Sequence, residues 1–534
     1  MLTICILDVE VIDNAVLGHA TPTLIYKGVR IGTPELRRQI GAFAASLKQL
    51  GVKRGDRLAV WLPNCPAWLV AHLGAARIGA MTMAVNTRFR SAEVEDILAR
   101  SGARLLLYWP GFLDIDFDAV LAQVHPSALE RLEHLVAYTE DAAGPLATRL
   151  FGVPQHDYHR LVADDVGELA DAGRKGDGAI LFTTSGTTGK PKLALHTQAS
   201  ITSHADEVAP AFGYDAADTA LLQALPLCGT FGHAQAMSVL RASGKLVLMP
   251  AFALEPALDL IQEHRVTALN GADTMFEDMM VSSKAGALAS VRGGGFAAFA
   301  TPDVEDFVAR AATFDLELFG LYGMSEVQAL FARQKPGAAI TERAPGGGFL
   351  VSPRAHFRVC DPDSCQVLPP GEAGELQLQG PSLFREYFEN PEATARAMTA
   401  DGYLRTGDLA RDEGGGRFTY LARMGDSLRL GGFLTSPAEI EAVIEQHTCV
   451  GTAQVVGVDT ARGTRPFAFV TVHHTAAPDA DELAQLCRQR LAKYKVPIRF
   501  VTLDALPMTD SPNGQKIQRV RLREMAMAHV AAQG

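Results

Sequence analysis

Apolar residues recur at two different spacings along the first part of the chain. Residues 33–52 place them three and four positions apart, which predicts an amphipathic helix, and residues 56–62 form a short apolar run, which predicts a strand. The same alternation continues through residues 65–86 and 91–109. Helices and strands that follow one another in this way indicate a layered α/β sheet.

Apolar runs in the central part of the chain predict further strands, at residues 178–186, 243–252, 264–273 and 314–323. From about residue 374 the pattern changes. Residues 374–380 and 417–424 are short runs bounded by glycine and aspartate, which is typical of a small β-rich lobe.

The segment after Arg423 has a pattern of its own. A helix is expected from Ser436, which can cap it, with Pro437 at the first helical position. Further strands and a helix are expected at residues 452–458, 466–472, 481–494 and 498–503. We therefore predict a large N-terminal domain of several subdomains, residues 1–424, and a small mobile α+β domain, residues 425–534.

The composition is that of an ordinary globular protein. Of the 534 residues, 48% are hydrophobic and 20% are charged, so a large core is available. The 49 basic and 60 acidic residues give a net charge of −11, which repels nucleic acid and anionic membranes alike. We therefore expect no nucleic acid partner, and an anionic ligand has to be bound by a local group of residues.

Cysteine usage and the N-terminus favour the cytoplasm. The seven cysteines are odd in number and form no CxxC pair, which fits a reducing compartment. The N-terminus is acidic and has no basic start, unlike a signal peptide. Residues 58–76 and 219–240 are uncharged and long enough to span a membrane, but proline interrupts both, so we interpret them as buried core.

An apolar strand that ends near Phe182 runs into a loop rich in hydroxyl groups and glycine. Such a loop supplies the donors, the close backbone approach and the positive charge that a polyphosphate needs. A Walker A loop requires a hydroxyl residue after its lysine, whereas Pro191 follows here, so a standard P-loop ATPase is disfavoured. A Ser/Thr-rich surface turn is the simple alternative. The candidate phosphate-binding residues are Thr184, Ser185, Gly186, Thr187, Thr188, Gly189 and Lys190.

Residues 185–192 read Ser-Gly-Thr-Thr-Gly-Lys-Pro-Lys. They match every defined position of the signature loop Ser-Gly-Thr-Thr-Gly-x-Pro-Lys, so the chain resembles the adenylate-forming (AMP-binding) superfamily. This family includes acyl-CoA synthetases, luciferases and peptide-synthetase adenylation domains. The resemblance extends over almost the whole chain, with the motifs in the family's order, and implies ATP, Mg²⁺ and coenzyme A as cofactors.

A second family motif, Gly-Leu-Tyr-Gly-Met-Ser-Glu, ends at Glu326. The resemblance implies that Tyr322 stacks on adenine and that Gly323 and Ser325 belong to the nucleotide site, where Ser325 contacts phosphate. It also implies that Glu326 binds Mg²⁺, with Thr184 as a second ligand. A flat ring, a hydroxyl donor and a hard oxygen ligand suit these roles. An ordinary strand end with a polar turn is the structural alternative.

Three further positions match family residues around the nucleotide and the thiol. Asp408, in a Thr-Gly-Asp motif, is expected to accept hydrogen bonds from both ribose hydroxyls, although an isolated Gly-Asp pair is also a common turn. Arg423 matches an arginine that contacts the nucleotide, and Gly432 matches the glycine beside which pantetheine passes. Gly425 stands where the family has a pivoting Asp or Lys, and its backbone freedom still allows a hinge there.

Lys516 lies in a loop after Pro-Asn-Gly and matches the catalytic lysine of the family. A lone exposed lysine is more often solvated surface. The order of the motifs favours catalysis, so the resemblance implies that Lys516 acts together with Glu326 and Thr184 in the adenylation step.

The acid-binding pocket is expected around Cys228, Gly229 and Phe231. Gly229 replaces a histidine or aromatic residue of the family and should leave space. Gly294 and Gly295 fall on a segment that we expect to be a loop lining the acyl channel. These apolar residues disfavour a strongly charged acid, and fatty, alicyclic and aromatic acids all stay open, with a weak preference for fatty or other hydrophobic acids.

The resemblance implies a two-step reaction. A carboxylic acid attacks the α-phosphorus of ATP, which gives acyl-AMP and pyrophosphate, and the thiol of CoA then takes the acyl group. Three alternatives stay open: transfer to a carrier-protein thiol, oxidation of the adenylate as in luciferases, and a nucleotide-binding regulatory protein without catalysis. A homodimer is compatible with the sequence, and no integral membrane segment is expected.

Overall fold

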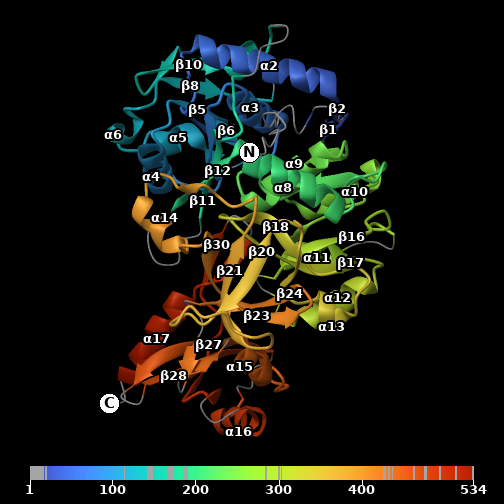
Figure 1. The fold of residues 1–534 in the computed structure, drawn as a ribbon, viewed down its shortest axis with the longest axis vertical. Coiled ribbons are helices and arrows are strands. Elements are labelled where there is room, and N and C mark those ends of the chain that lie inside the picture. Colours follow the sequence, from blue (N-terminus) through green and yellow to red (C-terminus); the bar gives the residue numbers. More distant parts are fainter. Residues whose placement is uncertain are drawn as a thin grey trace, which may run out of the picture.

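The chain folds into a large upper body and a smaller lower body that contains most of the C-terminal elements (Figure 1). Both consist of helices and strands, which confirms the predicted α/β fold class. The computed structural model describes residues 17, 21–113, 115–140, 148–164, 172–184, 191–282, 286–298, 301, 303–424, 428–430, 433–435, 437–460, 463–473, 478–491, 495–511 and 514–531.

The first large sheet is built by the alternating N-terminal elements. β3 (Arg57–Trp61) pairs in parallel with β4 (Met81–Ala84) on one side and with β5 (Leu105–Tyr108) on the other. α2 (Thr33–Gln49) and α3 (Pro66–Arg77) pack on each other beside these strands. The strand order is β22-β12-β11-β4-β3-β5-β8-β10-β9. Its other members are β8 (His134–Ala137), β9 (Arg149–Leu150), β10 (Val153–Asp157), β11 (Gly178–Thr183), β12 (Leu193–Thr197) and β22 (Glu386–Tyr387).

The second large sheet carries the β-rich lobe at one of its ends. β17 (Glu317–Met324) turns back as β18 (Gln328–Arg333), and the order is β15-β16-β17-β18-β19-β24-β23-β21-β20. The remaining strands of this sheet are β15 (Gly271–Ala272), β16 (Gly293–Ala297), β19 (Gly347–Leu350), β20 (His356–Cys360), β21 (Ala373–Gln379), β23 (Leu404–Gly414) and β24 (Arg417–Arg423). A smaller sheet runs β13 (Ala220–Gln223), β14 (Lys245–Leu248), β1 (Thr23–Tyr26) and β2 (Val29–Gly32).

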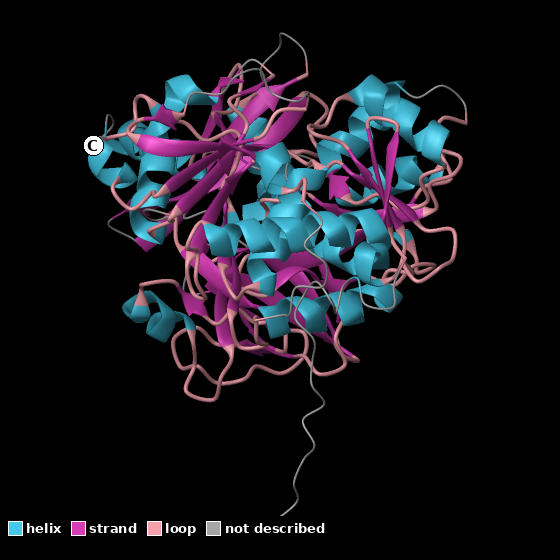
Figure 2. Ribbon diagram, turned by 90° about the horizontal axis from the view of Figure 1, so that it is seen from above, coloured by secondary structure: helices cyan, strands magenta, loops and turns pink. Residues whose placement is uncertain are grey.

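Helices fill the space between the sheets (Figure 2). α8 (Gln198–Ala211) packs on α9 (Thr230–Arg241), and α9 also contacts β18 of the second sheet. Almost all of α9 is buried, and its larger buried polar side chains are hydrogen-bonded, His233 to His72 and Gln235 to Gln223. Shorter elements of this body are β6 (Gly111–Phe112), β7 (Ile115–Asp116), α4 (Ser91–Ser101), α5 (Phe117–Leu121), α6 (Pro126–Leu129), α7 (Tyr158–Leu161), α10 (Leu254–His264), α11 (Asp273–Ser282), α12 (Val304–Ala312), α13 (Ile340–Arg343) and α14 (Pro391–Ala397).

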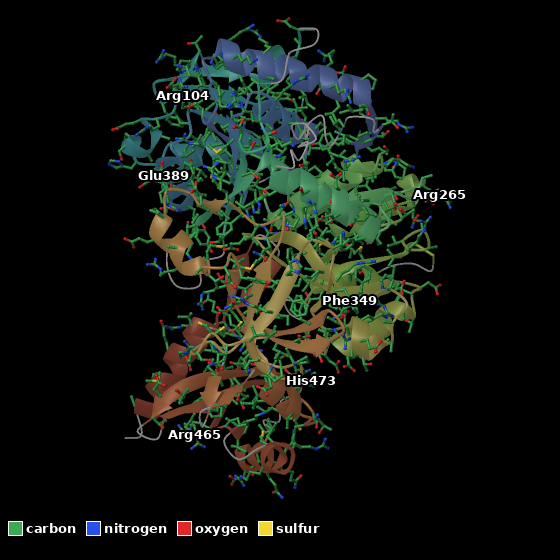
Figure 3. The ribbon with its side chains drawn as sticks, in the orientation of Figure 1. Arg104, Arg265, Phe349, Glu389, Arg465 and His473 are labelled. Atoms are coloured by element: carbon green, nitrogen blue, oxygen red, sulfur yellow. The ribbon has the colours of Figure 1, made fainter. Side chains whose placement is uncertain are left out.

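The lower body has hydrophobic clusters of its own. Two clusters consist only of residues from Leu428 onward, and the labelled side chains of Arg465 and His473 lie in this body in Figure 3. The predicted boundary at 424/425 stays a prediction, because residues 425–427 lie outside the described ones. The helices and strands after residue 424 are β25 (Leu428–Leu430), β26 (Phe433–Thr435), α15 (Pro437–Ile444), β27 (Val450–Thr460), β28 (Gly463–Val472), α16 (Ala480–Arg490), β29 (Phe500–Thr502), β30 (Met508–Ser511), β31 (Gly514–Ile517) and α17 (Arg519–Ala531).

The two uncharged stretches are buried core, as predicted. Residues 58–76 form most of β3 and α3, and residues 219–240 contain β13 and nearly all of α9. Among the residues that the structure describes, no helix combines the length and the apolar character needed to cross a bilayer.

Two sequence predictions about the large body differ from the structure. The strand expected at 264–273 is mostly absent, since α10 reaches His264, Arg265 closes it with a left-handed backbone (φ 51°), and only Gly271–Ala272 form a strand. Residues 293–295, expected as a loop, belong to strand β16. The three glycines there carry no apolar signal, so the periodicity of side chains gave no sign of a strand.

Candidate functional site

The predicted phosphate loop is the connection of a β-hairpin. β11 and β12 pair antiparallel, and Thr184 and Lys192 close the loop between them. The Thr184 N–H donates to the Lys192 carbonyl at 2.9 Å, and the Lys192 N–H donates to the Thr184 hydroxyl at 3.1 Å. The structure therefore fixes where the loop begins and ends. Ser185, Gly186, Thr187, Thr188, Gly189 and Lys190 lie outside the described residues.

The Gly-Leu-Tyr-Gly-Met-Ser-Glu motif forms the end of β17 and the turn into β18. Gly323 is required there by close packing, because a Cβ atom would lie 2.5 Å from the Ala329 Cα. His196, on the strand after the phosphate loop, donates from Nε2 to the Ser325 carbonyl at 2.7 Å. This bond brings the two motifs together, although 129 residues separate its partners.

Glu326 is a buried carboxylate that accepts a hydrogen bond from a neighbouring tyrosine. Its side chain is 5% exposed, and the Tyr387 hydroxyl donates to its Oε1 at 2.6 Å. Burial raises the pKa of Glu326, and the bond from Tyr387 and the charge of Lys192 act in the opposite direction. A carboxylate that is ionised in such a place is stabilised by a cation.

The residues fit a Mg²⁺ ion that is held mainly by a substrate. Among the described residues, no group of three or more His, Cys, Asp and Glu side chains is arranged to hold a metal. Mg²⁺ in nucleotide enzymes is commonly bound by one or two carboxylates together with the phosphates. Glu326 can serve as such a carboxylate, and its role as a Mg²⁺ ligand stays a prediction, as does that of Thr184.

Three residues that were predicted to bind the nucleotide contact one another beside this turn. Asp408 on β23 accepts from the Tyr322 hydroxyl at 2.5 Å and from Arg423 Nη1 at 2.7 Å. Asp408 and Arg423 are direct partners in the β23–β24 ladder, which explains why their side chains meet. Burial raises the pKa of Asp408, whereas the guanidinium of Arg423 lowers it. Tyr322 is buried too, and its ring contacts those of Phe418 and Tyr420.

The remaining thiol and catalytic positions are only partly described. Lys516, predicted in a loop, instead lies in the short strand β31, where its backbone pairs with Thr509 of β30. Its side chain is not among those that the structure describes. Gly432, expected beside the thiol tunnel, and Gly425, expected at the hinge, also lie outside the described residues.

The predicted pocket loop precedes α9. Gly229 is the residue before the first turn of that helix, and a Cβ atom on it would be 3.6 Å from the Pro226 carbonyl oxygen, an ordinary contact. The position therefore has room for a methyl group. Cys228 and Phe231, on either side, are buried in the core.

The glycines of β16 are there for packing. A Cβ atom on Gly294 would lie 1.5 Å from the Leu269 carbonyl oxygen, and one on Gly295 would lie 2.3 Å from a methyl carbon of Leu321. The Gly295 N–H also donates to the Asn270 side chain at 2.8 Å. The role of Gly294 and Gly295 in the pocket stays a prediction. Close packing alone already explains why these two positions are glycine.

Tyr387 was not among the predicted site residues. It lies 61 residues after Glu326 and contacts it through the edge strand β22. The predicted motifs do not include it, and only its position beside the charged residues Arg385, Glu386 and Glu389 could have drawn attention to it.

Comparison with known proteins gives one consistent result. The sequence profile of the AMP-binding enzyme family matches residues 14–388, and that of the AMP-binding enzyme C-terminal domain matches residues 439–512. A methyl-dioxo-octahydro-indenyl-propanoyl:CoA ligase of Mycobacterium tuberculosis is 31% identical over 520 residues, which cover 94% of this chain and 95% of that protein. A feruloyl-CoA synthase of Amycolatopsis is 30% identical, over 92% of this chain and 94% of that protein.

Solved structures agree with the sequence relatives. A benzoate CoA ligase from Burkholderia xenovorans superposes with a TM-score of 0.78 at 26% identity, over 96% of this chain and 100% of that chain. The O-succinylbenzoate coenzyme A synthetase of Bacillus subtilis, in complex with AMP, gives a TM-score of 0.77 at 25% identity, over 96% and 97% of the two chains. The chain therefore belongs to the AMP-binding enzyme family, among its acyl-CoA synthetases, which are acid–thiol ligases.

Proposed function

We propose that this protein activates a hydrophobic carboxylic acid with ATP and Mg²⁺, forms acyl-AMP with release of pyrophosphate, and transfers the acyl group to CoA. One observation carries the proposal most of all. The His196–Ser325 bond joins the closed base of the phosphate hairpin to the turn that carries Glu326, and the Tyr322–Asp408–Arg423 cluster includes the strand that leads into this turn. These are the parts that an ATP-dependent adenylation needs.

In the first step, one carboxylate oxygen of the acid attacks the α-phosphorus and pyrophosphate leaves. The phosphate loop would surround the triphosphate with hydroxyl and N–H donors, and Lys516 would stabilise the charge that develops on the α-phosphoryl oxygens. Glu326 would hold Mg²⁺, which supplies positive charge to the phosphates when it is bound. Asp408 would accept from the ribose hydroxyls, in exchange for part of its present bonding with Tyr322 and Arg423.

In the second step, the CoA thiol attacks the acyl carbon, and the bond between that carbon and the AMP oxygen breaks. We propose that the C-terminal domain rotates near Gly425 between the steps, which withdraws Lys516 and places Gly432 beside the thiol. Glycine at this hinge suits such a rotation, because it adopts many backbone conformations.

The acyl groups in the names of the relatives support a substrate acid that is largely apolar. Their names refer to feruloyl, to an alicyclic indenyl-propanoyl group and, for a rat mitochondrial relative of 25% identity, to medium-chain acyl groups. The described residues of the predicted pocket, Cys228 and Phe231, are apolar and buried. We therefore propose a fatty, alicyclic or aromatic acid.

A panel of carboxylic acids, each incubated with ATP and Mg²⁺ with and without CoA, tests the proposal. We expect pyrophosphate release that depends on one class of apolar acid, and an acyl-CoA product when CoA is present. ADP formation, or AMP formation that no acid stimulates, would contradict it. If the acyl group were transferred only to a carrier protein that bears phosphopantetheine, this carrier protein and not CoA would be the second substrate.

A further inference from the structure

A short segment between β21 and α14 clamps the turn that carries Glu326. The Phe384 N–H donates to the Glu326 carbonyl at 2.7 Å, and the N–H groups of Arg385 and Phe388 donate to the carbonyls of Leu195 and Leu193 on β12. This segment, residues 384–388, thus forms backbone bonds both to the carboxylate turn and to the strand that follows the phosphate loop.

Tyr387 projects from this clamp to Glu326. It faces Ala194 in the β12–β22 ladder, and its hydroxyl donates to Glu326 Oε1 at 2.6 Å. Both side chains are 5% exposed, so water does not compete for this bond. The bond engages Oε1 and restrains the orientation of the carboxylate, which can still offer an oxygen to a cation.

The ring of Tyr387 is itself held from two sides. The Lys192 ammonium lies 4.4 Å from the ring centroid, and the Phe384 ring packs edge-on with centroids 4.8 Å apart. Lys192 also closes the phosphate hairpin through Thr184. The phenol therefore links the base of the phosphate loop to the carboxylate turn.

We propose that Tyr387 is a positioning residue for the metal-binding carboxylate, and that it holds Glu326 in the orientation that receives Mg²⁺·ATP. This inference rests on the proposed role of Glu326. Hydrogen-bond partners of metal ligands order the ligand before the metal arrives, and their loss commonly weakens metal binding about 10–100-fold. A role in packing alone would require the ring and leave the hydroxyl without consequence.

Tyr387→Phe separates these two roles, because it keeps the ring, the Lys192 contact and the Phe384 contact. The measurement is calorimetric binding of α,β-methylene-ATP over a series of Mg²⁺ concentrations, which needs no turnover. We expect the Mg²⁺ concentration for half-maximal tightening to rise roughly ten-fold, with little change in nucleotide binding when Mg²⁺ is absent. An unchanged Mg²⁺ requirement in the folded variant would overturn the proposal.

Two further variants complete the test. Tyr403→Phe, a matched loss of a hydroxyl from a ring that contacts Arg358, is expected to leave the Mg²⁺ requirement unchanged. Glu326→Gln is expected to abolish the Mg²⁺ effect, and Tyr387→Phe should add nothing in that background. A Mg²⁺ effect that survives Glu326→Gln would refute the proposed function of Glu326, whereas loss in Glu326→Gln without any shift in Tyr387→Phe refutes only the positioning role.

If Tyr387→Phe fails to fold, Phe384→Leu gives a second measure. It loosens the ring contact and keeps the hydroxyl, so we expect a smaller rise in the Mg²⁺ requirement in the same direction. No rise in that variant would also count against the proposal.

Discussion

Asp408 accepts hydrogen bonds from two side chains that belong to different strands. Tyr322 and Arg423 both donate to it, across 86 and 15 residues of sequence. The motif around each residue could be predicted from the sequence, but their mutual bonding could not, because it depends on how β17, β23 and β24 come together. The same holds for the contact between Tyr387 and Glu326.

Lys516 is proposed to act in the adenylation step and not in thioester formation. Lys516→Ala is expected to slow adenylation by about a hundred-fold or more, because a cation that stabilises charge at the reacting phosphoryl group contributes on this scale. Thioester formation from supplied acyl-AMP should be nearly unchanged. Pyrophosphate release and acyl-CoA formation, measured separately, check this, with Lys335→Ala as a matched surface control. Equal losses in both half-reactions would contradict the role.

At the scale of the elements, the spacing of apolar side chains along the sequence predicted most helices and strands, because the apolar faces of these elements pack against their neighbours. It failed at β16, where glycines form the strand, and at 264–273, where a left-handed residue ends a helix. In both places the backbone of another strand decides the structure. Ala268, for example, forms isolated bridges to both Leu221 and Gly293.

The turn between β17 and β18 depends on Gly323 in the same way. Gly323→Ala should lower the free energy of unfolding by about 1–3 kcal/mol, because its Cβ atom would meet the Ala329 backbone and force a shift. Gly229→Ala is the matched control, since the added methyl meets only an ordinary contact, and its stability should stay within about 0.5 kcal/mol. Urea unfolding of both variants measures the difference. Equal stabilities would show that the turn adapts without cost.

At the scale of the whole molecule, buried histidines link stability to pH. Burial lowers the pKa of His72 to about 3 and those of His196 and His204 to about 4, and that of His233 lies well below its usual value. The folded state therefore binds fewer protons than the unfolded state below about pH 6.5. The contribution of these neutral histidines to stability is complete above that pH. It is lost as the pH falls toward their pKa values in the folded state.

Each histidine should destabilise the fold by about 1.4 kcal/mol per pH unit within this window. The carboxyl groups of Glu326, Asp408 and Glu445, whose pKa values are raised by burial, act in the opposite direction as the pH falls. A variant comparison isolates the histidine part. His204→Gln should reduce the loss of stability between pH 6 and 5 by about 1.4 kcal/mol in urea unfolding. An unchanged pH dependence would show that His204 is not kept neutral by burial.

The central claim is that the acid becomes an acyl-adenylate, and oxygen transfer tests it most directly. With a carboxylate labelled with ¹⁸O, attack on the α-phosphorus leaves a labelled oxygen between carbon and phosphorus. When CoA then displaces AMP at the acyl carbon, that oxygen departs with AMP. Mass spectrometry is therefore expected to find one ¹⁸O atom in the AMP formed. Unlabelled AMP, or ADP as the nucleotide product, would contradict the account.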